Sequence, residues 1–344
     1  MCPLGPIARN TVIVLAACCT LGAGCAARKE VVDRDRALVE TLAADGAKLE
    51  SLNGDLADGA RALRDGELDE AKAALDRHVG KHPGSALGAY HLVLWALESA
   101  KPSVAQGYFQ RASDLDSQFH AALCHLGVLY LRQGEDVAAL RVLEQALVLA
   151  PDDVRVLANV GAARARRGLW SEALQAYQAA NKIAPAHGSL LYDTALVWMA
   201  RSQWQPALDL VEQAISVRPF FAPAHAAKIV CLQGIGQIDE AEAAAKQAID
   251  ELPQPNHELL IAYARLLVHR RQIADAMKRL RMAVDVAPED AGAQLALGEL
   301  SDAAGDRAAA TEMYQRFLKN PQRLAEDSRR IRDRLKQLQS GKQE

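Results

Sequence analysis

The sequence of 344 residues has few aromatic residues and few cysteines outside its first 25 positions. Aromatic residues make up 5% of the chain, and runs of β-branched residues are short beyond the amino-terminal segment. Both features argue against a protein built of β-sheets. Alanine, leucine, glutamate, arginine and glutamine dominate instead, and these residues favour helices. We therefore predict an all-α protein.

The sequence also lacks an excess of charge of one sign. Its formal net charge of -3 is spread along the chain without a long block of acidic or basic residues. Surfaces that bind nucleic acids are strongly basic, so we expect no nucleic-acid partner.

Beyond Cys25 the only cysteines are Cys124 and Cys231. They lie three repeats apart in the register described below, whereas a disulfide needs Cα atoms about 5.5 Å apart. We interpret both side chains as small buried hydrophobic groups and do not expect a disulfide framework.

Common catalytic and metal-binding motifs are absent from the sequence: it contains no H-E-x-x-H, no G-x-S-x-G, no Walker loop and no C-x-x-C cluster. His78 and His82 could share a helix face, with His91 nearby, but without a carboxylate or thiol ligand beside them we expect no metal site and no cofactor. Glu299 and Asp302 form a carboxylate pair that we interpret as a solvated face. We therefore predict that the protein is not an enzyme.

The amino terminus has the layout of a secretory signal. An apolar run from Thr11 to Leu21 follows Arg9 and precedes small residues up to Cys25, and it is too short for the roughly 20 residues of a membrane span. The segment L-G-A-G-C that ends at Cys25 resembles the lipobox of bacterial lipoproteins, whose cysteine is acylated. Cys18, after L-A-A, is the alternative lipid site, and an ordinary cleaved signal without a lipid is the other alternative.

The resemblance to lipoproteins implies that residues 1–24 are removed and that palmitate-type acyl chains anchor Cys25. Such chains contribute about 0.8 kcal/mol of membrane binding per buried CH₂ group. In this family an aspartate after the lipid-bearing cysteine tends to retain the protein in the inner membrane. Ala26 and Ala27 therefore imply an outer-membrane protein that faces the periplasm.

Prolines recur at one constant interval, at Pro151, Pro185, Pro219 and Pro253. With these prolines at repeat position 32, eight repeats start at the following residues: Leu52, Ala86, His120, Val154, Gly188, Ala222, His257 and Ala291. Position 20 is then alanine in every repeat, position 8 is mostly small and position 24 is mostly bulky. This pattern resembles that of the tetratricopeptide repeat family, a helix-turn-helix unit of about 34 residues.

The resemblance implies a right-handed superhelical solenoid of antiparallel helix pairs, with about eight repeats over residues 52–321. Glycines at Gly134, Gly168 and Gly236 are expected to close first helices. Residues 25–51 would link the lipid anchor to the array, with a helix over 29–50. Residues 322–344 are expected to form a capping helix, because a stripe of apolar residues recurs there at helical spacing: Leu324, Ile331, Leu335 and Leu338.

Repeat positions 2, 5, 9 and 12 of the first helices remain free once the other apolar positions pack, so they would line a concave groove. We predict that this groove binds a partner, because a large exposed apolar surface usually marks a binding site. The alternative is that curvature buries these side chains against the next repeat. The predicted groove residues are Leu87, Tyr90, Leu94, Leu97, Cys124, Val128, Leu131, Ala158, Ala162, Tyr192, Leu196 and Met199.

The sequence thus predicts a scaffold or assembly lipoprotein that holds a helix or an extended segment of another envelope protein. Tetratricopeptide lipoproteins of this layout include pilotins that escort secretin subunits. A permanent subunit of a motility or secretion machine is the alternative, and an accessory to a periplasmic hydrolase is the rival from another class. Family members that clamp a carboxyl terminus use two asparagines at positions held here by Val128 and Asn159, so we do not predict that ligand.

Overall fold

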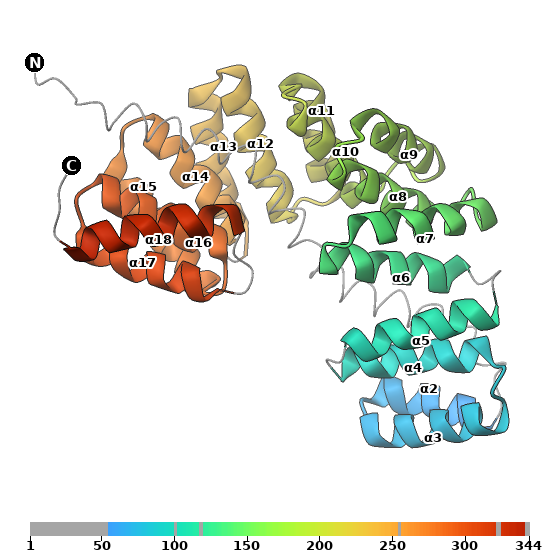
Figure 1. Cartoon of the computed structure of the whole chain (residues 1–344). Helices are drawn as coiled ribbons and strands as arrows, with labels where there is room; N and C mark the ends of the chain where they lie inside the picture. The colour runs from blue at the N-terminus through green and yellow to red at the C-terminus, as the bar shows by residue number, and fades with distance from the viewer. Residues whose placement is uncertain (1–53, 100–101, 117–119, 254–255, 321–324, 341–344) are drawn as a thin grey trace, which may run out of the picture. The chain divides into compact units, whose positions relative to one another are not determined.

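The computed structural model describes residues 54–99, 102–116, 120–253, 256–320 and 325–340, and all regular structure in them is α-helical (Figure 1). The predicted all-α class is therefore confirmed. The predicted signal at 1–24, Cys18 and Cys25 and the linker at 25–51 lie outside the described residues. None of the described helices combines the length and hydrophobicity that a membrane span requires.

The chain divides into two compact units at Pro185, which we call the N-unit (described residues 54–185) and the C-unit (described residues 186–340). In each unit a first helix pairs with a second helix, and that second helix contacts the next first helix. The hairpins of the N-unit are α2 (Asp55–Asp65) with α3 (Leu68–Lys81), α4 (Ala86–Glu98) with α5 (Pro102–Leu115), α6 (His120–Gln133) with α7 (Asp136–Leu149), and α8 (Val154–Arg166) with α9 (Trp170–Ile183).

The described residues of the C-unit form four further hairpins and one single helix. Its hairpins are α10 (Gly188–Ala200) with α11 (Trp204–Val217), α12 (Ala222–Ile235) with α13 (Ile238–Glu251), α14 (His257–His269) with α15 (Ile273–Val286), and α16 (Ala291–Ala303) with α17 (Arg307–Lys319). The single helix is α18 (Ala325–Ser340), which packs on α17.

Small side chains allow the helices of each hairpin to approach closely. Repeat position 20 is alanine throughout, and all eight alanines are 0% exposed: Ala71, Ala105, Ala139, Ala173, Ala207, Ala241, Ala276 and Ala310. A Cβ atom on Gly127 at position 8 would lie 2.4 Å from the Leu143 side chain at position 24, so the glycine leaves room for the leucine. In the α12–α13 hairpin the sizes are exchanged, because Ile229 stands at position 8 and Ala245 at position 24, both fully buried.

The described turns inside the hairpins use the left-handed backbone conformation at repeat position 15. Gly134, Gly168 and Gly236 have φ angles of 80°, 73° and 93°, so the predicted glycine turns are confirmed. The same position is occupied by Ser202 and Arg271, which have φ angles of 57° and 62°.

Helix α18 stands in register with the first helix of a ninth repeat, because Ala325 follows Ala291 by the same interval that separates successive prolines. It buries Ile331 against the α16–α17 hairpin, next to Tyr314 and Phe317. Position 8, where other first helices meet their second helix, is the exposed Arg332. The helix therefore covers an apolar face on one side and presents a polar face on the other, as the end of a repeat array requires.

Candidate partner-binding surface

The N-unit buries much of the predicted groove. Tyr90, Cys124, Val128 and Leu131 are between 2% and 7% exposed, since neighbouring first helices contact each other directly. For these four the alternative reading, burial against the next repeat, describes the structure. Half-buried positions are Leu94, Ala158 and Ala162, while Leu87 is 39% exposed; the side chain of Leu97 lies outside the description.

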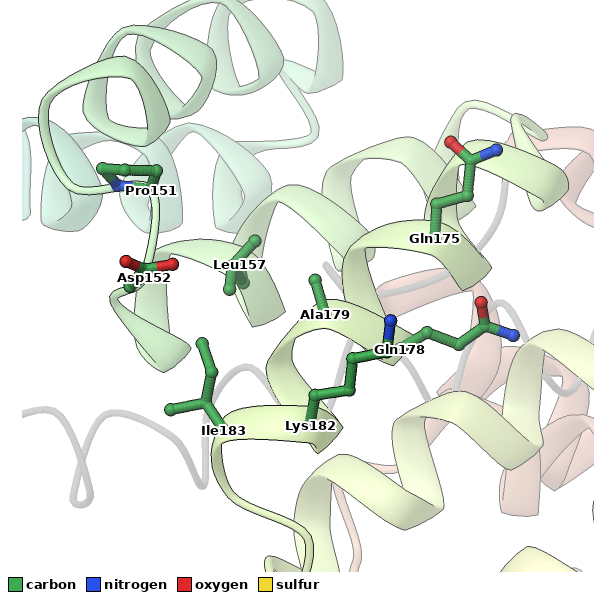
Figure 2. A pocket seen from close by; sticks show the side chains of 8 residues that line it. All are labelled: Pro151, Asp152, Leu157, Gln175, Gln178, Ala179, Lys182 and Ile183. Atoms are coloured by element: carbon green, nitrogen blue, oxygen red, sulfur yellow. The ribbon is translucent and has the colours of Figure 1, made fainter.

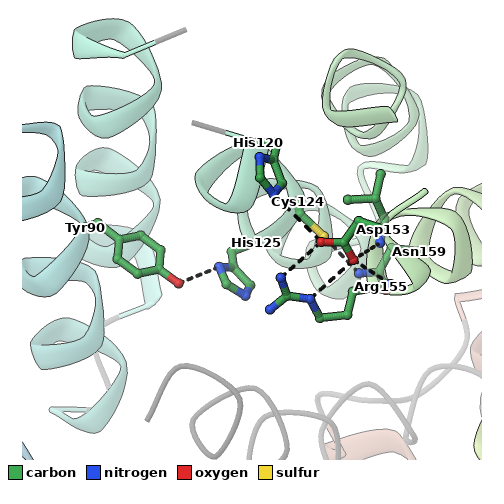
Figure 3. A network of polar contacts seen from close by, with 8 residues as sticks. Tyr90, His120, Cys124, His125, Asp153, Arg155 and Asn159 are labelled. Carbon is green, nitrogen blue, oxygen red and sulfur yellow. Dashed lines mark hydrogen bonds and ion pairs between the residues drawn. The ribbon is translucent and has the colours of Figure 1, made fainter. Parts of the chain in front are cut away.

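The buried part of this surface is held by polar contacts between successive first helices, which Figure 3 shows. The hydroxyl of Tyr90 is hydrogen-bonded to Nδ1 of His125 at 3.0 Å, and the two rings stack with centroids 5.7 Å apart. One repeat later Asn159 donates from Nδ2 to the sulfur of Cys124 at 3.2 Å. Each contact joins position 5 of one repeat to position 6 of the next. The sequence signal for these contacts is a pair of side chains at those two positions of successive repeats that can form a hydrogen bond.

Burial makes the two described thiols unreactive. It raises the pKa of Cys124 to about 11, despite the hydrogen bond from Asn159, and the pKa of Cys231 to about 12. Because the thiolate is the nucleophile and the metal ligand, neither cysteine offers chemistry at neutral pH. The interpretation of both as buried hydrophobic groups is confirmed.

Charges at the edge of the Figure 3 network are neutralised locally. Asp153 caps α8 by accepting the backbone N–H of Arg155 at 2.8 Å, and the Arg155 guanidinium lies 3.0 Å from the same carboxylate. Burial would raise the pKa of Asp153, but these hydrogen bonds outweigh it and lower the pKa. His120 Nε2 stands 3.8 Å from Asp153 on the other side. This part of the N-unit therefore holds its repeats together and leaves no unpaired charge on Asp153.

The C-unit leaves an apolar strip half exposed. Tyr192 is buried, with its ring edge-on to Phe221 at 5.1 Å. Around it the first helices α10, α12 and α14 carry half-buried apolar side chains that pack on the core of the unit and still reach solvent. We call these four residues the C-unit strip: Leu196, Met199, Val230 and Val268.

The histidines considered as metal ligands have structural contacts. His78 Nε2 lies 3.0 Å from the hydroxyl of Ser85, and its ring centroid is 5.0 Å from that of His82. His91 is buried, and its Nδ1 contacts the carbonyl of Leu87 at 2.9 Å. Among the described residues, no three histidine, cysteine, aspartate or glutamate side chains are grouped as metal ligands.

The carboxylate pair is not solvated as the sequence suggested. Glu299 is buried and accepts a hydrogen bond from Arg330 at 2.6 Å, and Asp302 accepts one from Arg334 at 2.7 Å. Both arginines come from α18, so the pair attaches the capping helix to α16. Burial raises the pKa of Glu299, although Arg330 opposes the shift. The interpretation as a solvated face was wrong because it did not place α18 over these residues.

Two shallow hollows of the N-unit lie away from the predicted groove residues. One, of about 420 Å³, lies against α8 and α9, and its lining is shown in Figure 2: Pro151, Asp152, Leu157, Gln175, Gln178, Ala179, Lys182 and Ile183. The other, of about 450 Å³, lies along α7 beside the exposed Val137 and Val148. Polar and charged side chains line part of each hollow, among them Lys182 in the first and Arg141 in the second.

Curated proteins offer a short match to this chain. The human protein O-mannosyl-transferase TMTC3 is 30% identical over 92 residues, which make up 27% of this chain and 10% of the human protein. The shared stretch is repeat sequence, and the chain spans about a tenth of the length of that relative.

Solved structures share the fold over most of the chain. A tetratricopeptide repeat protein from Parabacteroides merdae superposes with a TM-score of 0.61 at 18% identity, covering 74% of this chain and 98% of its own. Yeast Tom70 gives 0.62 at 14% identity, covering 83% and 64%. PilF of Pseudomonas aeruginosa gives 0.50 at 18% identity, covering 66% and 95%. At these identities the likeness concerns the fold alone.

Family models identify the repeats themselves. One model described as tetratricopeptide repeat matches residues 90–153 and 138–188, and another with the same description matches residues 233–294. The fold is typical of scaffolds for protein–protein interaction that have no catalytic activity of their own. The chain therefore contains tetratricopeptide repeats, and its hairpins share their fold.

Proposed function

We propose that this protein is a lipid-anchored scaffold of the bacterial envelope, attached to the outer membrane and facing the periplasm. In this proposal its first-helix surface holds a segment of another envelope protein, as a pilotin or another assembly factor does. The anchor is the acylated Cys25, and the partner is held as a helix or an extended segment.

The C-unit strip carries the proposal for binding. Leu196, Val230 and Val268 come from three successive first helices. Each packs against the core of the C-unit on one side and remains half exposed to solvent. Solvent contact with apolar surface is unfavourable by about 25 cal/mol per Å². A partner that covers the strip would remove this contact with solvent. A suitable partner is an extended segment with alternating apolar side chains, or a helix with one apolar face.

The chemistry of the site favours binding over catalysis. Glu299 and Asp302, the carboxylate pair noted in the sequence, each accept a hydrogen bond from an arginine of α18. The described thiols are buried and protonated at neutral pH. The carboxylates and thiols therefore stabilise the fold, and this supports a scaffold in preference to a hydrolase.

Site-specific photo-crosslinking in the bacterium tests the binding surface. A photoreactive phenylalanine analogue would replace Leu196 on the C-unit strip, and in a matched control it would replace Val148, which is 81% exposed on the second helix α7. We expect a discrete crosslinked envelope protein from position 196 and none from position 148. Crosslinks from position 148 alone would place the partner on the second helices and contradict the proposed surface.

A further inference from the structure

Arg265 is a half-buried arginine of α14 that has unused hydrogen-bond donors. Its Nε atom is buried without a hydrogen-bond partner, and no ion pair to its guanidinium is found among the described residues. A buried donor that has lost water and gained no acceptor costs about 1 to 3 kcal/mol. An acceptor arriving from outside the described chain would remove that penalty.

Two arginines near Arg265 in the sequence have partners within this chain. Arg270, five residues further along at the carboxyl end of α14, pairs with Asp239 at 2.6 Å and with Glu242 at 3.0 Å. Arg279 lies over the ring of Tyr263 at 5.2 Å. Glu299 is near enough for the charge of Arg265 to lower its pKa slightly, but its hydrogen bond comes from Arg330. The chain itself thus leaves Arg265 without a carboxylate partner.

Arg265 stands between apolar first-helix residues and Glu299, which is position 9 of the next first helix, α16. Repeat position 9 is Leu196 on α10, Val230 on α12 and Arg265 on α14, so the guanidinium continues the row that the C-unit strip begins. Helices α12 and α14 contact each other directly, which sets the arginine beside the strip. On α14 itself, Ile261 and Val268 stand one turn before and after it.

We propose that the C-unit strip and Arg265 together bind a protein segment whose apolar side chains are followed by one aspartate or glutamate. This inference rests on the proposed function and names the chemistry of the partner. The planar guanidinium can hold both oxygens of a carboxylate at once. The proposal assigns this carboxylate to a side chain of the segment and not to a chain end.

Peptide display on the full chain tests the acidic residue. A library of random 16-residue peptides displayed at the amino end of a phage coat protein contains no free carboxyl terminus, so only side chains can supply the carboxylate. Selections would run in parallel on the wild-type chain, on Arg265→Gln and on the control Arg270→Gln, whose arginine already has partners. Peptides selected on the wild type and on Arg270→Gln should share one acidic position among apolar residues. Those selected on Arg265→Gln should lack it.

A synthetic amidated peptide from the wild-type selection then gives the size of the effect. Replacing its acidic residue by the corresponding amide should weaken binding to the wild-type chain about tenfold and leave binding to Arg265→Gln unchanged. The melting temperature of Arg265→Gln should not fall below the wild-type value, because the arginine has no hydrogen-bond partner in the fold to lose.

Four results would overturn the proposal, and they separate its failure from failure of the function on which it rests. An acidic position selected equally on Arg265→Gln, or no acidic position at all, would overturn the inference alone, provided that Leu196→Glu abolishes binding of the selected peptides. Peptides whose binding Leu196→Glu leaves intact would overturn the binding surface as well. A full chain that selects no peptide would overturn both.

Discussion

Ser202 and Arg271 occupy the backbone position that is glycine in the other described hairpin turns. Their φ angles of 57° and 62° lie in the left-handed region, which disfavours side chains by about 1 to 2 kcal/mol. Glycine avoids this strain but loses more freedom on folding. In the other described turns a glycine adopts the left-handed conformation without this strain, for example Gly236 at a φ of 93°.

Ser202→Gly should therefore stabilise the C-unit by about 0.5 to 1 kcal/mol, because relief of the strain exceeds the added entropy loss. Urea denaturation followed by circular dichroism measures the change. In the matched control Gly236→Ala should destabilise the protein, since it introduces the same strain. A lower urea midpoint for Ser202→Gly would mean that the serine side chain makes a contact that outweighs its backbone.

Glu299 provides a prediction that depends on pH. Burial raises the pKa of Glu299 in the folded state, so the folded protein binds its proton more tightly than the unfolded chain does. The stability that this group contributes is full below its unfolded pKa and is lost as the pH rises through the folded pKa. Glu299→Gln has no such dependence.

The stability of Glu299→Gln relative to the wild type should consequently increase between pH 4 and pH 7. Urea midpoints at the two pH values give the comparison. Glu312→Gln, on the exposed face of α17, controls for the loss of one negative charge. A difference that shrinks as the pH rises would mean that Arg330 outweighs burial at this site.

At the scale of the helix pair, the α12–α13 hairpin exchanges the large and the small side chain that most hairpins use. Ile229 stands on the first helix, and Ala245 on the second takes the place of a leucine or an aromatic residue. The neighbouring α14–α15 hairpin has the usual order, with Ala264 and Leu280, and both of these are also buried. Both hairpins thus fill the space between their helices with one large and one small side chain, but the helix that supplies the large one differs.

Ile229→Ala alone should destabilise the C-unit by about 2 to 5 kcal/mol through the cavity it leaves, and Ala245→Leu alone by about 1 to 3 kcal/mol through overpacking. The double variant has the residue pair of the α14–α15 hairpin, so it should recover much of the loss. Thermal unfolding of the three variants gives the coupling energy. Additive losses would show that the two side chains do not share one space.

The positions of these helices could be predicted because the proline period and the alanine column record how hairpins stack. Pro185 and Pro219 place the starts of α10 and α12 at the residues where the structure begins them. Exposure along the first helices could not be predicted in the same way. The distance between neighbouring first helices depends on how all the side chains of the two hairpins pack together. As a result Tyr90 and Leu131 are buried, whereas Leu196 is half exposed.

The contacts of α18 were also beyond the sequence pattern. Its apolar stripe indicated a capping helix, but nothing in the stripe showed that Arg330 and Arg334 would meet Glu299 and Asp302. Ion pairs between repeats connect residues about 30 positions apart, and only the register of a ninth first helix brings those columns together. A carboxylate pair read in isolation therefore looked solvated.

At the scale of the whole molecule, the proline period runs without interruption through Pro185, where the structure divides into the N-unit and the C-unit. The sequence thus marks the repeats but not the boundary between the units. Each unit has its own apolar core and its own share of first-helix surface. The polar contacts of Tyr90 and Asn159 bury part of that surface in the N-unit, although Leu94 and Ala162 stay half-buried there. The C-unit strip is half exposed as well and adds Arg265, whose buried Nε lacks a hydrogen-bond partner, which is why the proposed partner contact is assigned to the C-unit.

The proposed membrane anchor makes the last prediction. If Cys25 carries the acyl chains, Cys25→Ser should move the protein from the membrane fraction to the soluble fraction, because each lost CH₂ group removes about 0.8 kcal/mol of membrane binding. Cys18→Ser is the matched control, since it changes the other candidate and should leave the protein with the membrane. For both variants, fractionation measures the share of protein in the membrane, and metabolic labelling with a palmitate analogue measures acylation. Release by Cys18→Ser alone would move the anchor to Cys18, and release by neither variant would contradict the lipoprotein proposal while leaving the C-unit strip to be judged by its own crosslinks.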